Sequence, residues 1–293
     1  MTTPVFILGL QRSGTTWLGN LLAAHPDVAV ATDPAHHGIH ESVFFSHFAR
    51  AWDWTDGVSR ATALRAFAAS DYGRLIGAEP RQMARTTAPA AHFVAAMEAF
   101  AQGRAAWVEK SPHHTRLADA IARDIPDARF ICVTRGSAGL IASRLHAYDR
   151  AVPTGLARKV AILRGAVSNA AHVRYLTGFA RRMGQRATLL RYEDLVTDRD
   201  ARMGELLGWL NLRRDVVLSS GFVANSSFTD RERPAFTTGE QRLIALSERL
   251  GRCIPTAVLR RLPLQSDFPA WVWSDPNDSH GVALAPARRR VYE

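Results

Sequence analysis

Side chains that bind anions are concentrated near the start of the chain, in the segment from Gly9 to Thr16. The apolar run from Val5 to Leu8 precedes it and is typical of a buried strand, and a helix is expected from Thr15 onward. A turn with glycine at each end, followed by a helix N-terminus, presents backbone N–H groups to a phosphate. The segment adds a guanidinium and hydroxyls to these amides, so it predicts a phosphate-binding loop and not a plain turn.

The spacing of Gly9 and Gly14 is that of the nucleotide-binding loop G-x-x-x-x-G-K-[ST], but Thr15 stands where that loop has its lysine. An NTPase uses the lysine on the terminal phosphates and the Ser or Thr that follows on magnesium. The positive charge within this loop is Arg12 instead. The sequence therefore favours an anionic donor that is bound without a metal.

A second anion site is indicated at Thr134 and Arg135, where the apolar run Arg129 to Val133 ends. An arginine that leaves a buried strand can clamp a phosphate in bidentate fashion, or it can pair with a carboxylate. Ser143 follows eight residues after Arg135, in an expected helix. In open α/β sheets ligands gather at the carboxyl ends of the strands, which is where both anion sites are predicted.

These segments resemble the sulfotransferases that use 3′-phosphoadenosine-5′-phosphosulfate (PAPS). QRSGTTWL followed by AAHPDV is similar to their phosphate loop, in the arginine form of the carbohydrate and tyrosylprotein branches. VTRGSAGLIAS is similar to the segment that grips the 3′-phosphate, although Gly136 and Ser137 replace the usual Asp or Asn and Pro. The resemblance covers about residues 4–24, 105–150 and 187–230. It implies PAPS as the donor, 3′-phosphoadenosine-5′-phosphate (PAP) as the product and no required metal.

The resemblance also implies which residues contact the donor. Tyr192, in RYEDL after the last expected strand, touches the nucleotide, and the segment Asn225 to Phe228 resembles one that closes over it. The implied donor-binding residues are Arg12, Ser13, Gly14, Thr15, Thr16, Trp17, Arg135, Ser143, Tyr192, Ser226 and Ser227.

Lys110 is one of two lysines among 37 basic residues, and it follows the apolar segment that begins at Trp107. In a chain that otherwise uses arginine, a lysine indicates a need for a compact and mobile ammonium. By resemblance Lys110 neutralises the bridging oxygen of the leaving phosphate and, with Arg12, is a catalytic residue. The alternative is a solvated lysine at a strand end.

Transfer to a hydroxyl also needs a general base, and three residues are candidates. By resemblance the carboxylate of the tyrosylprotein and carbohydrate enzymes falls on Asp33, which precedes Pro34. Glu109 resembles the base of the heparan-type enzymes, and His113 lies one residue beyond the Lys-x-His arrangement of the phenol branch. A helix cap, an ion pair and a polar surface residue are the respective alternatives. The order of preference is Asp33, Glu109, His113.

The elements that must position these residues alternate between strands and helices. Strands are expected at about 5–8, 28–31, 107–109, 129–133 and 187–190, with helices between them. This alternation predicts a P-loop-type α/β fold, with a mainly parallel five-stranded sheet and helices on both faces. We expect a single domain over residues 1–293, with an insertion at about 35–104 whose aromatic side chains face the acceptor, and an irregular tail from about residue 263.

Composition is that of an ordinary globular protein, with 47% hydrophobic and 22% charged residues. The net charge of +10 comes from arginines spread along the chain, which fits a polyanionic nucleotide ligand and does not indicate nucleic acid. Cys132 and Cys253 give no disulfide framework, and the cluster His36, His37, His40 and Glu41 lacks the H-E-x-x-H order, so we expect no metal site. No targeting or membrane-spanning run is recognised, and a cytoplasmic location is expected.

The predicted function is transfer of a sulfuryl group from PAPS to a hydroxyl of a small-molecule, lipid-like or sugar acceptor, including a glycan. Two other classes stay open. One is a P-loop kinase or NTPase, in which Glu193 or Asp194 would hold magnesium, and the other is a non-catalytic nucleotide- or polyanion-binding protein. The sequence identifies neither the acceptor nor the oligomeric state.

Overall fold

A computed structural model describes residues 2–34, 38–80, 86–146, 151–219, 235–262 and 267–274. The strands within them are β1 (Thr3–Leu8), β2 (Val28–Val30), β3 (Thr32–Asp33), β4 (Gly38–Ile39), β5 (Ala106–Lys110), β6 (Arg129–Thr134) and β7 (Ala187–Arg191). The α-helices are α1 (Thr15–Ala23), α2 (Ala49–Ala51), α3 (Gly57–Ala69), α4 (Asp71–Leu75), α5 (Pro89–Ala101), α6 (Ala118–Asp124), α7 (Ser137–Leu145), α8 (Gly155–Met183), α9 (Tyr192–Thr197), α10 (Arg199–Trp209), α11 (Thr238–Cys253) and α12 (Thr256–Arg261). Shorter turns of helix are η2 (Phe44–Phe48), η4 (Pro112–Leu117), η6 (Gly184–Arg186) and η8 (Ala270–Val272).

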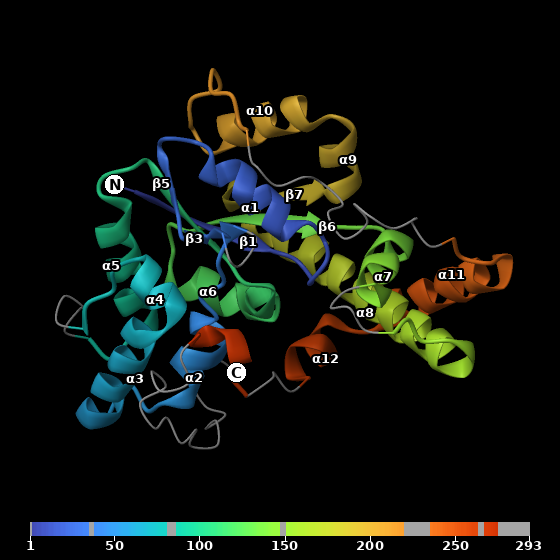
Figure 1. Cartoon of the computed structure of the whole chain (residues 1–293), viewed down its shortest axis with the longest axis horizontal. Helices are drawn as coiled ribbons and strands as arrows, with labels where there is room; N and C mark the ends of the chain where they lie inside the picture. Colours follow the sequence, from blue (N-terminus) through green and yellow to red (C-terminus); the bar gives the residue numbers. More distant parts are fainter. Residues whose placement is uncertain are drawn as a thin grey trace.

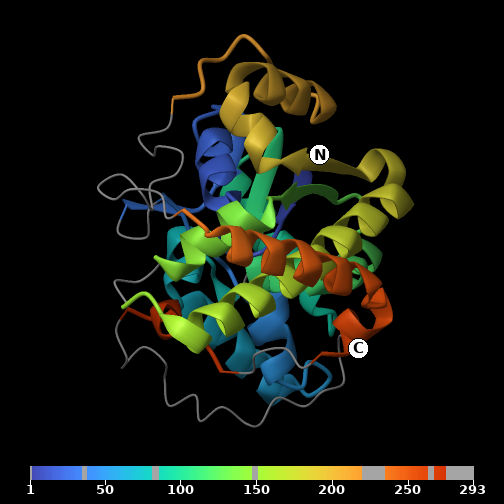
Figure 2. The same ribbon diagram turned by 90° about the vertical axis from the view of Figure 1, so that its right-hand side faces the viewer.

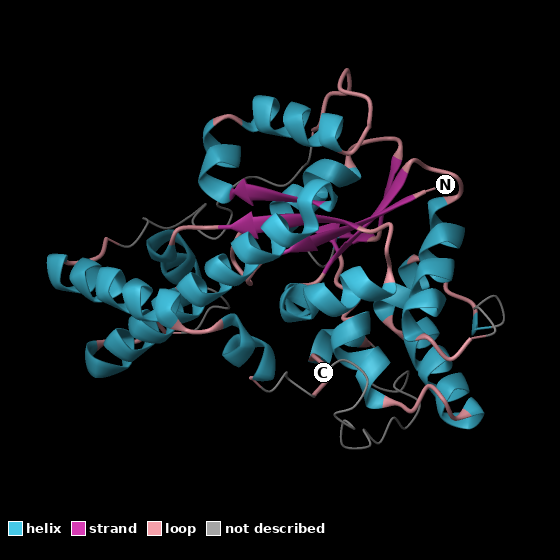
Figure 3. Cartoon of the chain, turned by 180° about the vertical axis from the view of Figure 1, so that it is seen from behind, coloured by secondary structure: helices cyan, strands magenta, loops and turns pink. Residues whose placement is uncertain are grey.

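Within the described residues, five strands form one parallel sheet in the order β2-β5-β1-β6-β7. Figure 3 shows this sheet between two layers of helices. The predicted α/β fold is confirmed, and each of the five expected strands is present with its ends shifted by at most two residues. Strand β1 is central, and the chain passes to β2 on one side of it and later to β6 on the other. The loops after β1 and β6 therefore flank a crevice of the kind in which such sheets bind ligands.

The two faces of the sheet carry different cores, because successive strand residues point to opposite faces. Val5 and Ile7 pack in one cluster with buried residues of α1, α9 and α10. Phe6 and Leu8 pack in the other, with residues of α5, α6 and α8. In Figure 1 α1, α9 and α10 lie above the sheet, and α5, α6 and α8 lie below it.

The aromatic residues that follow β4 fill the second core. Phe44, Phe45, Phe48 and Trp54 are at most 2% exposed, and the ring of Phe44 lies 4.9 Å from those of Phe67 and Phe93. The prediction that aromatic side chains of this segment face the acceptor is wrong for these four rings. Their burial reflects the large apolar area that each ring removes from water.

Helices α7, α8 and α11 also pack against one another at one end of the sheet, where α11 lies along α8 (Figure 2). Ile141 of α7, Ile162 of α8 and Ile244 of α11 share a small core. Helix α8 runs from Gly155 to Met183, with Thr154 as its N-cap. In the part of the chain that the structure describes, no helix is both long and apolar enough to cross a bilayer.

Candidate active site

The loop after β1 has the backbone of an anion-binding turn. Arg12 and Gly14 adopt left-handed conformations, with φ of 73° and 96°, and Ser13 Oγ donates to the Leu10 carbonyl at 2.7 Å. Helix α1 begins at Thr15, and its N-cap is Gly14, which has no side chain to accept from the first N–H groups. The first N–H groups of a helix need partners, and an anion held in the loop can supply them.

Tyr192, the first residue of α9, packs directly on this loop. A Cβ atom at position 14 would overlap the Tyr192 ring, so the ring requires glycine there in addition to the positive φ. The same ring lies edge-on to Trp17 at 5.9 Å and under the guanidinium of Arg135 at 4.2 Å. The structure therefore brings together four residues that the sequence predicted from three separate segments.

The two predicted anion sites meet through hydrogen bonds. Arg12 Nε donates to Ser143 Oγ at 3.0 Å, and one terminal nitrogen of Arg135 donates to the Arg12 carbonyl at 2.9 Å. These partners are 131 and 123 residues apart in the sequence. They meet because β1 and β6 are adjacent parallel strands, with Leu8 opposite Cys132, so that the following loops leave the sheet side by side.

The other predicted donor-binding residues are placed as follows. Ser13 and Thr15 are buried, and Thr16 is partly exposed in the first turn of α1. Ser226 and Ser227 lie outside the described residues.

Lys110 ends β5 and forms an ion pair with Glu41, with 2.6 Å between Nζ and Oε1. The lysine side chain is only 2% exposed, which rules out the alternative of a solvated surface lysine. Strand alternation directs Lys110 toward the face that α1 covers, the same face as Val108. Sequence reasoning considered Glu41 only as part of a metal cluster, since no spacing rule links it to a lysine 69 residues away.

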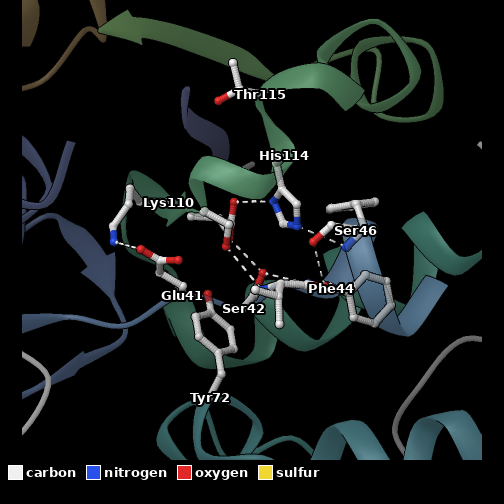
Figure 4. A network of polar contacts seen from close by, with 12 residues as sticks. Glu41, Ser42, Phe44, Ser46, Tyr72, Lys110, His114 and Thr115 are labelled. Atoms are coloured by element: carbon white, nitrogen blue, oxygen red, sulfur yellow. Dashed lines mark hydrogen bonds and ion pairs between the residues drawn. The ribbon is translucent and has the colours of Figure 1, made fainter. Parts of the chain in front are cut away.

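Glu109 points to the opposite face and is buried. It takes part in a network of polar contacts that includes Ser42 and His114, which are labelled in Figure 4. Its Oε1 accepts from Ser42 Oγ at 2.7 Å and from Ser111 Oγ, and its Oε2 accepts from His114 Nδ1 at 2.9 Å. His114 Nε2 accepts from the Phe45 N–H, which assigns the ring proton to Nδ1. Burial alone would raise the pKa of Glu109, but His114 and these hydrogen bonds outweigh it, and the pKa lies below the usual value.

This network also fixes the backbone next to Glu41. Ser111 Oγ accepts from the Val43 N–H, and Ser42 Oγ accepts from the Phe44 N–H. Val43 is held at a φ of 44°, a costly conformation for a β-branched residue. The contacts around Glu109 thus stabilise the strained turn at Val43. Glu41, the partner of Lys110, lies just before this turn.

Asp33 lies in a small hairpin beside α1. Strand β3 pairs with β4 so that Asp33 is opposite Gly38, and Ile39 N–H donates to Asn20 Oδ1 of α1 at 2.7 Å. Asp33 is partly exposed. It therefore lies on the same side of the sheet as the phosphate loop and Lys110, whereas Glu109 faces the aromatic core.

His113 follows Lys110 by three residues and packs against His47, with 5.4 Å between ring centroids. Its pKa is lowered, chiefly by burial and also by His114 and Lys110, although the Glu41 carboxylate acts in the opposite direction. The imidazole is therefore neutral at pH 7, the form that accepts a proton. The described residues contain no group of three or more His, Cys, Asp or Glu side chains arranged to hold a metal ion.

Two cavities adjoin these residues. One, of about 510 Å³, is lined by Leu10 and Gln11 of the loop and by His113. The other, of about 550 Å³, is lined by Thr134, Arg135 and the start of α7. The phosphate loop thus borders one cavity, and the end of β6 borders the other.

Comparison with known proteins points to one family. The model of the sulfotransferase family matches residues 4–215. The nodulation protein NoeE of Sinorhizobium fredii (strain NBRC 101917 / NGR234) is 26% identical over an alignment of 255 residues, and the alignment covers 77% of this chain and 55% of NoeE. The chain thus spans about half the length of this relative. The crystal structure of a sulfotransferase from Alicyclobacillus acidocaldarius shares the fold, with a TM-score of 0.51 and 16% identity over 92% of this chain and 99% of that chain.

Proposed function

Since the chain belongs to the sulfotransferase family, we propose that it transfers the sulfuryl group from PAPS to a hydroxyl of a small-molecule, lipid-like or sugar acceptor. The observation that carries the proposal is the cluster of Arg12, Arg135 and Ser143 at the carboxyl edge of the sheet. Two guanidiniums and a helix N-terminus whose N-cap is a glycine, at one place, suit a ligand with more than one anionic group. PAPS, which carries a 3′-phosphate and a 5′-phosphosulfate, fits this donor set.

The roles follow from position. Arg12 and the amides at the start of α1 bind the 5′-phosphosulfate, and Arg135 with Ser143 binds the 3′-phosphate. The ring of Tyr192, packed between the loop and Arg135, contacts the nucleotide. The arginine in the loop also supports our assignment to the carbohydrate and tyrosylprotein branches.

In the reaction, a bond forms between the acceptor oxygen and sulfur while the bond between sulfur and the bridging phosphate oxygen breaks. Lys110 neutralises the charge that develops on the bridging oxygen. Asp33 takes the proton of the acceptor hydroxyl, since it lies on the same side of the sheet as the loop. His113 is the second candidate base, because its neutral ring borders the cavity beside the loop. The occupied oxygens of Glu109 support a positioning role for that residue.

The kinase reading is less well supported, because Thr15 occupies the position of the NTPase lysine. We also propose a cytoplasmic location, in keeping with two cysteines that are free thiols.

Isothermal titration calorimetry with PAP, 5′-AMP and ATP, each with and without magnesium, tests the donor. PAP is expected to bind without magnesium and at least tenfold more tightly than 5′-AMP, because it has a second phosphate. Arg135→Ala should remove this difference, whereas Arg199→Ala, at an exposed arginine that pairs with Asp200, should preserve it. Preference for ATP with magnesium would support the kinase reading, and equal affinity for PAP and AMP in the wild type would contradict the proposal.

Turnover is measured in the same variants with radiolabelled PAPS. Lys110→Ala should lower kcat by roughly 10² or more with PAP affinity retained. Lys159, the other lysine, is exposed on α8 and provides the matched control, since Lys159→Ala should behave as wild type. Equal turnover of the two variants would remove Lys110 from the mechanism.

A further inference from the structure

The cavity of about 510 Å³ next to the phosphate loop is lined by described residues from six parts of the chain. Its walls come from the loop after β1, from η2 and η4, from α7 and α8, and from α12 and the residue after it. This volume is within the range of pockets that bind small molecules.

The cavity lies where an acceptor would have to lie. Leu10 and Gln11 in its wall immediately precede Arg12, and His113 in its wall follows Lys110, the last residue of β5, by three residues. Lys110, which pairs with Glu41, ends β5 two residues before Pro112, another lining residue. The cavity therefore borders the loop and the residues to which we assign the reaction.

Positive and neutral polar groups dominate its polar wall. The described lining residues include Arg116, Arg144, His113 and His172 and contain no Asp or Glu. Arg116 donates to the carbonyls of Leu259 and Leu262, and Arg144 to that of Gln11. Backbone carbonyls thus hold both guanidiniums at the wall, and each guanidinium has five N–H donors.

The rest of the wall is apolar. Leu10, Pro112, Leu259 and Leu262 contribute carbon surface, while Ser46 and Ser168 contribute hydroxyls. The pKa of Arg116 is lowered, chiefly by burial and then by Arg50, so a second positive charge lies nearby. An anion entering this cavity would be attracted by several positive groups in a partly desolvated setting, where such interactions are strong.

We propose that this cavity binds the acceptor, and that the acceptor carries an oxyanion group (carboxylate, sulfate or phosphate) in addition to the hydroxyl that receives the sulfuryl group. The inference rests on the proposed function, since it needs a sulfuryl donor in the adjoining loop. Arg116 and Arg144 bind the anionic group, and the apolar wall contacts the body of the molecule. The cavity should therefore bind anionic acceptors more tightly than neutral ones.

The test saturates the protein with PAP, so that the donor site is filled, and then titrates it calorimetrically with matched probes. One pair is 4-hydroxyphenylacetate and the neutral 4-hydroxyphenylacetamide, and the other is methyl glucuronoside and methyl glucoside. In at least one pair the acid is expected to bind tenfold more tightly than its neutral partner. Arg116→Gln should abolish that preference by weakening the acid about tenfold, and Arg144→Gln provides a second, independent variant.

Arg199→Gln, at an exposed arginine of α10, is the matched control and should keep the preference of the wild type. Equal affinity for acid and neutral probe, absence of binding by both acids, or an unchanged preference in folded Arg116→Gln and Arg144→Gln would overturn the inference. A loss of PAP affinity in Arg116→Gln would assign the cavity to the donor and would overturn it too. Failure of PAP to bind the wild type would instead contradict the proposed function.

Discussion

Neighbouring residues at the end of β5 have different tasks because strand residues alternate between faces. Glu109 points into the aromatic core, where serines and a histidine satisfy both of its oxygens. Lys110 points toward the face of α1 and pairs with Glu41. A Glu-Lys pair that looks like one catalytic unit in the sequence is thus divided between a buried network and the face of the sheet that α1 covers.

Conservative substitutions can separate the roles proposed for the ionisable residues Asp33, Glu41, Glu109 and His113. Asp33→Asn should remove most turnover and spare PAP affinity, since the change keeps the shape and removes only the charge. Glu41→Gln should lower kcat less than Asp33→Asn does, because it affects the reaction only through the position of Lys110.

Glu109→Gln should chiefly lower the stability of the folded protein, by about 1–3 kcal/mol, because the new amide N–H₂ group faces hydrogen-bond donors. Turnover, PAP affinity and urea unfolding are measured for each variant.

If Asp33→Asn remains active and His113→Gln is inactive with PAP affinity intact, the role of base moves to His113. The assignment of Glu109 to a structural network would be contradicted by a Glu109→Gln variant of unchanged stability and lost turnover.

At the scale of elements, most of the fold followed from the sequence because each strand is a short apolar run bounded by polar residues. The sequence also predicted correctly that Arg12, Lys110 and Arg135 lie at the carboxyl ends of their strands. The pairing of Lys110 with Glu41 could not be predicted, since it depends on the turn after β4. That turn owes its strained Val43 and the π-helical residues Phe44–Phe48 to contacts with η4 and the core, which no local pattern encodes.

Glycine at position 14 is required by both the conformation and the neighbours of the phosphate loop, and this can be tested. Gly14→Ala should lower PAP affinity at least tenfold, because Cβ would displace the Tyr192 ring that packs on the loop. Gly103 is the matched control, since its φ of +80° is also left-handed but a Cβ there meets nothing within 4 Å. Gly103→Ala should cost about 1 kcal/mol of stability and leave PAP binding unchanged. Equal PAP affinity in both variants would contradict a role for the Gly14–Tyr192 contact.

At the scale of the whole molecule, a basic chain with a net charge of +10 gathers several of its cationic and imidazole groups around one cavity. Composition indicated a polyanionic ligand, but it could not reveal this gathering, because Arg116, Arg144 and His172 come from different helices. Burial among like charges disfavours further protonation. Desolvation, and then the charge of His113, lowers the pKa of His47 to about 3. The pKa of His172 is lowered to about 4, chiefly by desolvation.

These two histidines predict how stability depends on pH. In the unfolded chain each binds a proton near pH 6.5, whereas in the folded protein each stays neutral to about pH 3 or 4, so the unfolded state binds more protons in between. Their stabilising contribution is therefore complete above pH 6.5 and is lost as the pH falls, by up to about 1.4 kcal/mol per pH unit for each. Urea unfolding between pH 4.5 and 7.5 measures this slope above the range in which Glu109, with its lowered pKa, gains a proton. His47→Gln and His172→Gln should each flatten it, and an unchanged slope in the double variant would show that other groups govern the acid sensitivity.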